Sequence, residues 1–194
     1  MDYVRMMYNV INLRFLNYSV QTIVLFYSML VIAPGYAEDI ECKTKVDFVR
    51  PTTSLSDFVD YKNGVVKQIS TGLMWQLCPV GQKWDGATCL GNATKMTFYQ
   101  ALTKAEENTA FGYTNWRLPN VKELYSIVER SCRGPYLNQI FSPFITGGSY
   151  WSSTFTRTIP YSIYGMSFSS GGFNMLGPST SLYPALLVRS VSND

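Results

Sequence analysis

The stretch TNWRLPNVKELYSIVER, residues 114–130, contains a full set of signals for the start of a helix. Pro119 disfavours helical backbone at the residue before it, and Asn120 is a good N-cap. Glu123 follows Asn120 by three residues and completes a capping-box pattern. We therefore expect a helix to begin directly after Asn120. Its apolar residues are Leu124, Ile127 and Val128.

The residues ahead of this helix, Trp116, Arg117, Leu118 and Pro119, predict a structural corner. Trp116 and Leu118 alternate with Arg117, so we expect the two apolar side chains to face the core. Arg117 then either points the opposite way or holds a buried carbonyl or carboxylate through its fixed fork of N–H donors. We interpret the corner as architectural and predict no catalytic role for it.

The first 37 residues have the pattern of a secretory signal peptide. Arg5 and Arg14 precede an uncharged apolar run over residues 20–33, and small residues follow up to Ala37. The run falls short of the roughly 20 apolar residues that a membrane-spanning helix needs. We predict cleavage after Ala37, no transmembrane span in the mature chain, and a bacterial protein that is secreted or located at the cell surface or in the periplasm. The predicted organisation is a signal peptide over 1–37, an N-terminal extension over 38–50 tied by Cys42, and one domain over 51–194.

The chain contains four cysteines, Cys42, Cys78, Cys89 and Cys132, all after the predicted cleavage point. An even number in an exported chain indicates two disulfides. Cys78 and Cys89 enclose CPVGQKWDGATC, whose glycines and proline favour a loop folded back on itself, so we pair them. This leaves Cys42 to pair with Cys132. The alternative is a zinc site, which a chain without CxxC and without histidine is poorly equipped to form.

The complete absence of histidine excludes most common hydrolase mechanisms. Ser-His-Asp and Cys-His catalysis, and metal sites with imidazole ligands, all require this side chain. No pair of carboxylates stands out as a general acid and base. We therefore predict that the protein is not an enzyme and that it uses no cofactor and no metal ion.

Charge is unevenly distributed along the chain, although the formal net charge is only +3. No Asp or Glu occurs between Arg130 and Asn193, whereas four arginines do: Arg130, Arg133, Arg157 and Arg189. Two interpretations stay open, a neutral β-rich region with scattered arginines or an anion-binding face. The mild net charge predicts no nucleic-acid partner.

Strand and helix patterns alternate along the chain and predict an α+β fold. Residues 58–75 indicate a hairpin with turns at Asn63-Gly64 and Thr71-Gly72. Thr97 can cap a helix that should end near Ala110. Short strands rich in aromatic and β-branched residues then predict an antiparallel sheet. These strands are expected within residues 150–155, 161–168, 173–176 and 183–191.

Four ordered motifs resemble the Lcl C-terminal domain family. They are TGLMWQ at residues 71–76, CPVGQKWDGATC at 78–89, NWRLPNVKEL at 115–124 and YWSST at 150–154. The resemblance covers the chain from about Pro51 onward. It implies a single C-type-lectin-like domain, similar also to the formylglycine-generating enzymes, with two helices packed on short antiparallel strands. The family's named member is a bacterial adhesin that binds sulfated glycosaminoglycans and carries a collagen-like stalk, which this sequence lacks.

Together these observations predict an exported binding module for sulfated or acidic glycans. The candidate ligand-binding residues are Arg133, Arg157, Arg189, Tyr161 and Tyr164. Arginine forks suit multi-oxygen anions, and aromatic rings suit the faces of sugars. The acid-free C-terminal region lacks the carboxylates that calcium prefers, so we expect binding that survives a chelator. The alternative is a protein-interaction or structural subunit of a bacterial surface or secreted assembly, and homo-oligomerisation stays open. An oxidase like the formylglycine-generating enzymes is disfavoured, because no cysteine follows Cys132.

Overall fold

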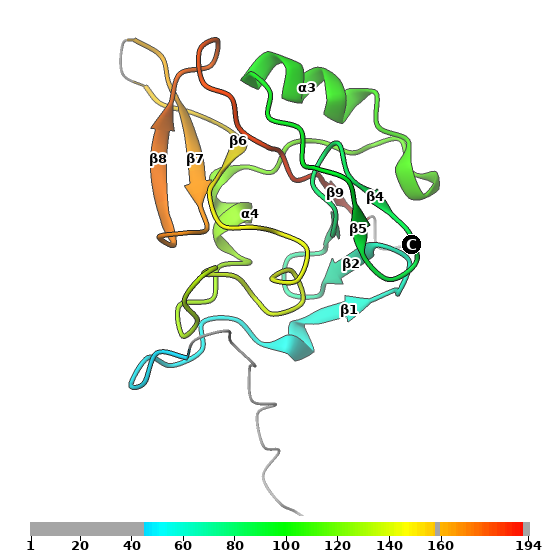
Figure 1. The fold of residues 1–194 in the computed structure, drawn as a ribbon, viewed down its shortest axis with the longest axis vertical. Helices are drawn as coiled ribbons and strands as arrows, with labels where there is room; N and C mark the ends of the chain where they lie inside the picture. Colours follow the sequence, from blue (N-terminus) through cyan, green and yellow to red (C-terminus); the bar gives the residue numbers. More distant parts are fainter. Residues whose placement is uncertain (1–44, 158–159, 192–194) are drawn as a thin grey trace, which may run out of the picture. The chain divides into compact units, whose positions relative to one another are not determined.

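The computed structural model describes residues 45–157 and 160–191. Within these residues the chain forms two main antiparallel sheets, a small two-stranded sheet and two α-helices (Figure 1). The predicted α+β class is therefore confirmed. No helix in this part of the chain has the length and apolar content needed to cross a bilayer.

The first sheet combines strands from both ends of the described chain. It has the order β1-β2-β3-β9 and is preceded by the 3-10 helix η1 (Leu55–Asp57). Its strands are β1 (Phe58–Asp60), β2 (Val65–Gln68), β3 (Leu73–Gln76) and β9 (Val188–Ser190). The predicted turn before β2 requires a glycine, because Gly64 has φ +94° and a Cβ there would lie 2.7 Å from Trp84 Cγ.

The segment predicted as a strand over residues 183–191 forms a strand only at Val188–Ser190, and this strand pairs with β3. The preceding residues have other backbone partners. Tyr183 exchanges two hydrogen bonds with Met96, and the Val80 N–H donates to Ala185 O at 2.9 Å. The prediction of one C-terminal sheet was therefore wrong for this segment, since its partners are distant in sequence.

The second sheet has the order β6-β7-β8 and consists of β6 (Ser149–Phe155), β7 (Ile163–Ser167) and β8 (Gly172–Leu176). In Figure 1 it stands beside the first sheet with α4 between them, and β8 forms its outer edge. Trp151 lies opposite Gly165 in the register. A Cβ at Gly165 would collide with the Leu176 side chain, so glycine here permits close packing.

The two α-helices begin where the sequence predicts and end earlier. Helix α3 (Phe98–Glu106) has a capping box between Thr97 and Gln100. It stops before Ala110, where the 3-10 helix η2 (Ala110–Gly112) follows. Phe111 within this turn has the left-handed φ of 59°, which a continuing helix does not allow.

Helix α4 (Val121–Tyr125) is a single short helix after the corner. Ser126 is its C-cap residue, and Ser126 Oγ donates to Glu123 O at 2.7 Å. Ile127 and Val128 are buried as predicted, but they lie beyond the helix.

The predicted disulfide between Cys78 and Cys89 is present, with a Cα–Cα distance of 5.5 Å. It closes a loop that contains β4 (Lys83–Trp84) and ends at the first residue of β5 (Cys89–Leu90). Cys132 is buried, and Cys42 lies outside the described residues. The Cys42–Cys132 disulfide therefore stays a prediction.

Two clusters of buried side chains make up the core. In one, Trp75 packs edge-on against Phe141 with 6.1 Å between ring centroids. In the other, Phe98 packs edge-on against Trp151 at 5.8 Å. Trp151 is fully buried, and its Nε1 donates to Met96 O at 2.7 Å. Trp151 is thus a core residue and is not available to a ligand.

Candidate functional site

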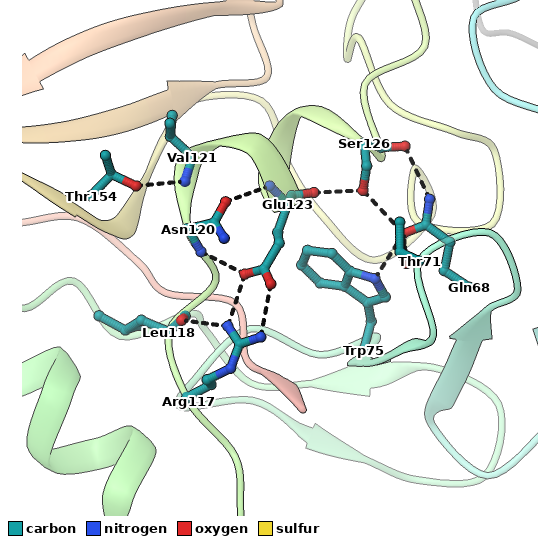
Figure 2. Close-up of polar contacts among 10 residues, drawn as sticks. All are labelled: Gln68, Thr71, Trp75, Arg117, Leu118, Asn120, Val121, Glu123, Ser126 and Thr154. Carbon is teal, nitrogen blue, oxygen red and sulfur yellow. Dashed lines mark hydrogen bonds and ion pairs between the residues drawn. The ribbon is translucent and has the colours of Figure 1, made fainter. Parts of the chain in front are cut away.

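The predicted corner is built around an ion pair between Arg117 and Glu123 (Figure 2). Arg117 Nη1 donates to Glu123 Oε2 and Nη2 donates to Oε1, both at 2.8 Å. The same carboxylate accepts from the Asn120 N–H at 2.7 Å, which completes the capping box. Trp116 and Leu118, on either side of Arg117, are buried. Of the two roles predicted for Arg117, the structure shows the one in which it holds a carboxylate.

The charges of this pair are satisfied by one another. The hydrogen bonds that Arg117 donates to Glu123 raise the pKa of Arg117, although burial opposes the shift. Burial by itself would raise the pKa of Glu123, but the hydrogen bonds from Arg117 and Asn120 outweigh it, and this pKa lies below its ordinary value of 4.5. A carboxylate held ionised by a fixed arginine is a poor general acid or base at neutral pH.

Backbone hydrogen bonds connect the corner to both sheets. Arg117 and Val188 of β9 exchange two bonds at 2.9 and 3.0 Å. On the other side, Ser153 N–H donates to Pro119 O at 2.8 Å. The Val121 N–H donates to the side chain of Thr154, at Oγ1, over 3.0 Å (Figure 2). The corner therefore joins the two sheets, which gives it an architectural role.

A second polar centre lies beside the corner and was not predicted from the sequence. The buried Gln68 accepts hydrogen bonds at its Oε1 from Trp75 Nε1, Thr71 Oγ1 and Ser126 Oγ, at 3.3, 3.0 and 3.0 Å (Figure 2). It links β2 to the end of α4. A polar residue in a short strand has no sequence signal that identifies such distant partners.

Glu129 is a further buried carboxylate, with no exposed surface. It accepts from Thr53 N at 2.8 Å, Thr53 Oγ1 at 2.7 Å and both Ser131 N and Ser131 Oγ at 2.8 and 2.7 Å. Thr52 N donates to both of its oxygens at 3.1 Å. Burial opposes ionisation, but these bonds outweigh it and lower the pKa of Glu129. The carboxylate thereby fastens residues 52–53 to the segment after α4.

Among the candidate ligand-binding residues, Arg189 is occupied by neighbouring side chains. Its Nε donates to Asn115 Oδ1 at 2.6 Å, and its guanidinium carbon lies 4.1 Å from the centroid of the Tyr113 ring. Arg133 is exposed and forms no ion pair with any described residue. Tyr164 lies on β7 opposite Met175 of β8.

Arg157 and Tyr161 lie together. They line a cavity of about 550 Å³ at the end of β6, which we call the Arg157 cavity. The other described residues that line it are Tyr99, Phe155, Thr156 and Pro178. Arg133, Arg189 and Tyr164 are not part of this lining, so the structure brings together two of the five candidates.

Two aromatic residues of the Arg157 cavity were missed by sequence reasoning. Tyr99 is 57% exposed at the start of α3, and Phe155 is 54% exposed at the end of β6. Their rings both pack against the buried Phe98, at 5.7 and 5.3 Å between centroids. Tyr99 does not belong to the buried face of its helix, which consists of Phe98, Ala101 and Ala105. A large aromatic residue outside that face was the one sequence feature that could have indicated a binding surface here.

Among the described residues, no group of three or more carboxylates and cysteines is arranged to hold a metal ion. A comparison with curated proteins finds no match. The model of the Lcl C-terminal domain matches residues 64–189, which is more than half of the chain and includes the disulfide loop, the corner and β6. The chain therefore belongs to the Lcl C-terminal domain family.

Proposed function

We propose that the protein is an exported, non-catalytic binding module for sulfated or acidic glycans, that it binds them without calcium, and that the Arg157 cavity is the binding site. The observation that carries this proposal is the presence of one arginine and three exposed aromatic rings in the same cavity. Ligand sites of this size commonly combine apolar walls with a few polar groups that orient the ligand.

The arginine of the cavity is available to an anion. Arg157 is exposed and forms no ion pair within the described part of the chain. None of the described residues that line the cavity carries a carboxylate, and the sequence contains no Asp or Glu between Arg130 and Asn193. A planar guanidinium with several free N–H donors matches the oxygens of a sulfate or carboxylate group.

The aromatic residues supply surface for the apolar faces of sugar rings. Tyr99, Phe155 and Tyr161 are 57%, 54% and 64% exposed. Tyrosines combine an apolar ring with a hydroxyl group, so they tolerate exposure and also offer a hydrogen bond to a ligand. Rings on three different segments around one arginine are suited to a ligand that carries both a charge and a carbon skeleton.

Export and the lectin-like fold belong to the same proposal. The Cys78–Cys89 disulfide supports an oxidising compartment, which fits the predicted signal peptide and a secreted, periplasmic or surface location. The short antiparallel sheets with two helices support the C-type-lectin-like fold that the family resemblance implies.

A panel of matched glycans tests the function. The oxidised protein, residues 38–194, is titrated with sulfated, carboxylated and neutral glycans of similar length, with and without EDTA and over a range of salt concentrations. We expect binding to the charged glycans that survives EDTA and weakens with salt, because exposed charges are screened over about 8–10 Å at physiological ionic strength. Equal binding to neutral glycans, or binding abolished by EDTA, would contradict the proposal.

A second candidate function is a protein-interaction module, and the outer edge of the second sheet favours it. Strand β8 is an edge strand that exposes Phe173 and Met175, by 55% and 70%. Edge strands without charges are prone to pair with another chain. If the protein self-associates through this edge, sedimentation velocity will show dimers in the wild type and monomers in Met175→Lys; a monomer in both cases removes this candidate as a self-assembly module.

A further inference from the structure

Four large apolar side chains lie together on an exposed surface where α4 meets the second sheet. Phe173 and Met175 alternate along β8, so both project from the same face of the sheet, and they are 55% and 70% exposed. Tyr164 of β7 lies opposite Met175 in the register and is also exposed. Tyr125 of α4 packs against Phe173, with 5.6 Å between ring centroids. We call these four residues the α4–β8 face.

Two basic side chains border the α4–β8 face. The guanidinium carbon of Arg130 lies 5.4 Å from the centroid of the Tyr125 ring. Lys122 precedes Tyr125 by three positions in α4, which places both on the same side of the helix. Lys122 and Arg130 are exposed, and neither forms an ion pair with any described residue. The surface therefore combines an apolar centre with a positively charged rim.

The carboxylates that are close to this rim in the sequence are already engaged elsewhere. Glu123 of α4 accepts two hydrogen bonds of 2.8 Å from Arg117. Glu129 is buried and accepts hydrogen bonds from Thr53 and Ser131. Strands β6, β7 and β8 contain no Asp or Glu. The positive charge of the rim is thus not neutralised from its own helix or from the adjoining sheet, and it favours an anionic partner.

The charge and the side-chain types of the α4–β8 face distinguish between two kinds of partner. A second copy that met this face with its own would bring the basic rims of both copies together, and like charges facing one another oppose association. An anionic lipid bilayer attracts basic residues at its surface. It also accepts tyrosine, phenylalanine and other apolar side chains at the boundary between headgroups and acyl chains. The observations therefore favour the bilayer.

We propose that the α4–β8 face docks the protein onto the surface of an anionic phospholipid membrane. Phe173 and Met175 enter the boundary region of the bilayer, and Lys122 and Arg130 contact the phosphate groups of the lipids. Binding of this peripheral kind needs no membrane-spanning segment. None of these residues lines the Arg157 cavity, so the proposal does not rest on the function assigned to that cavity.

The test is co-sedimentation of the oxidised protein with vesicles of phosphatidylcholine alone or mixed with phosphatidylglycerol. We expect binding to the mixed vesicles that weakens with salt, and little binding to phosphatidylcholine alone. The double variant Phe173→Ala/Met175→Ala should bind at least about tenfold more weakly, because two apolar side chains no longer enter the bilayer. Its control is Ile69→Ala, which alters a side chain that is 55% exposed but lies outside the face.

The charged rim is tested in the same assay. Arg130→Gln should weaken binding to the mixed vesicles by about fivefold, the contribution of one basic residue close to an anionic membrane. Arg157→Gln removes an exposed arginine that is not part of the α4–β8 face and should leave vesicle binding unchanged. Circular dichroism of each variant shows whether it is folded, so loss of binding is separated from loss of structure.

Three results would overturn the proposal: no binding at millimolar lipid, equal binding to both kinds of vesicle, or equal effects of the face variants and their controls. A dimer that the double variant dissociates, together with no vesicle binding, would assign the face to contact between copies and reject the membrane. Glycan binding at the Arg157 cavity should be unchanged in the double variant. Failure of the membrane proposal therefore leaves the proposed function standing, and failure of glycan binding leaves the vesicle results unaffected.

Discussion

Removing the Glu123 carboxylate tests how much the corner contributes to stability. Glu123→Ala deletes two hydrogen bonds of 2.8 Å to Arg117 and the 2.7 Å bond from the Asn120 N–H. A hydrogen bond to a charged group contributes about 1.5–3 kcal/mol, and a lost cap costs about 1 kcal/mol. The Arg117 side chain is 42% exposed and will be rehydrated, which reduces the cost. We expect the free energy of unfolding to fall by about 2–3 kcal/mol in total.

A matched control is the exposed ion pair between Lys104 and Glu107, whose atoms lie 3.0 Å apart. Both side chains are 59% exposed, so Glu107→Ala should cost no more than about 0.5 kcal/mol. The assay is urea unfolding of the oxidised protein at neutral pH, followed by tryptophan fluorescence. A lower midpoint for Glu123→Ala with an unchanged slope reports lost stability. Equal small losses in both variants would refute the view that the corner holds the two sheets together.

Three further predictions concern the rest of the fold. Because the pKa of Glu129 is lowered in the folded protein, its carboxylate stabilises the fold fully above the ordinary pKa of 4.5, and this stabilisation is lost as the pH falls from there through the folded pKa. Urea midpoints measured over this falling pH range should therefore drop less in Glu129→Gln than in the wild type. Gly165→Ala should cost about 1–3 kcal/mol by overpacking, whereas Gly172→Ala, where the nearest atom to the new Cβ is 3.6 Å away, should be close to neutral in the same unfolding assay. Replacing Cys78 and Cys89 by serine should lower the free energy of unfolding by about 3 kcal/mol, the loop-closure entropy that a disulfide across a loop of this length removes from the unfolded chain. A variant as stable as the wild type would mean that the loop is held by other contacts.

The local features of this fold could be predicted from the sequence because their causes lie within a few residues of each other. The capping boxes at Thr97 and Asn120 depend on a residue three positions later, and both are present. The turn at Gly64 and the Cys78–Cys89 loop are likewise local. For the partner of Arg117, the sequence predicted only the chemical group, a carbonyl or a carboxylate, and not the residue. Its capping neighbour Glu123 fills that role.

The features that could not be predicted depend on contacts between distant segments. The residues after Tyr183 pair with Met96, Val80 and β3, and nothing in their own pattern names these partners. The end of α4 is set by Ser126 and its contact with Gln68, 58 positions earlier. The lining of the Arg157 cavity likewise comes from α3, β6 and the segment after β8. The composition of the sequence therefore indicated a basic region but did not locate a binding site within it.

The most direct test of the proposed function compares two arginine variants against one sulfated glycan. Arg157→Ala and Arg133→Ala each remove one exposed positive charge from the acid-free region, but only Arg157 lines the cavity. Isothermal titration at moderate salt should show affinity reduced about tenfold or more by Arg157→Ala, and little changed by Arg133→Ala. Equal losses in the two variants, or an unchanged affinity in Arg157→Ala, would contradict the account, because binding would then follow overall charge or another surface.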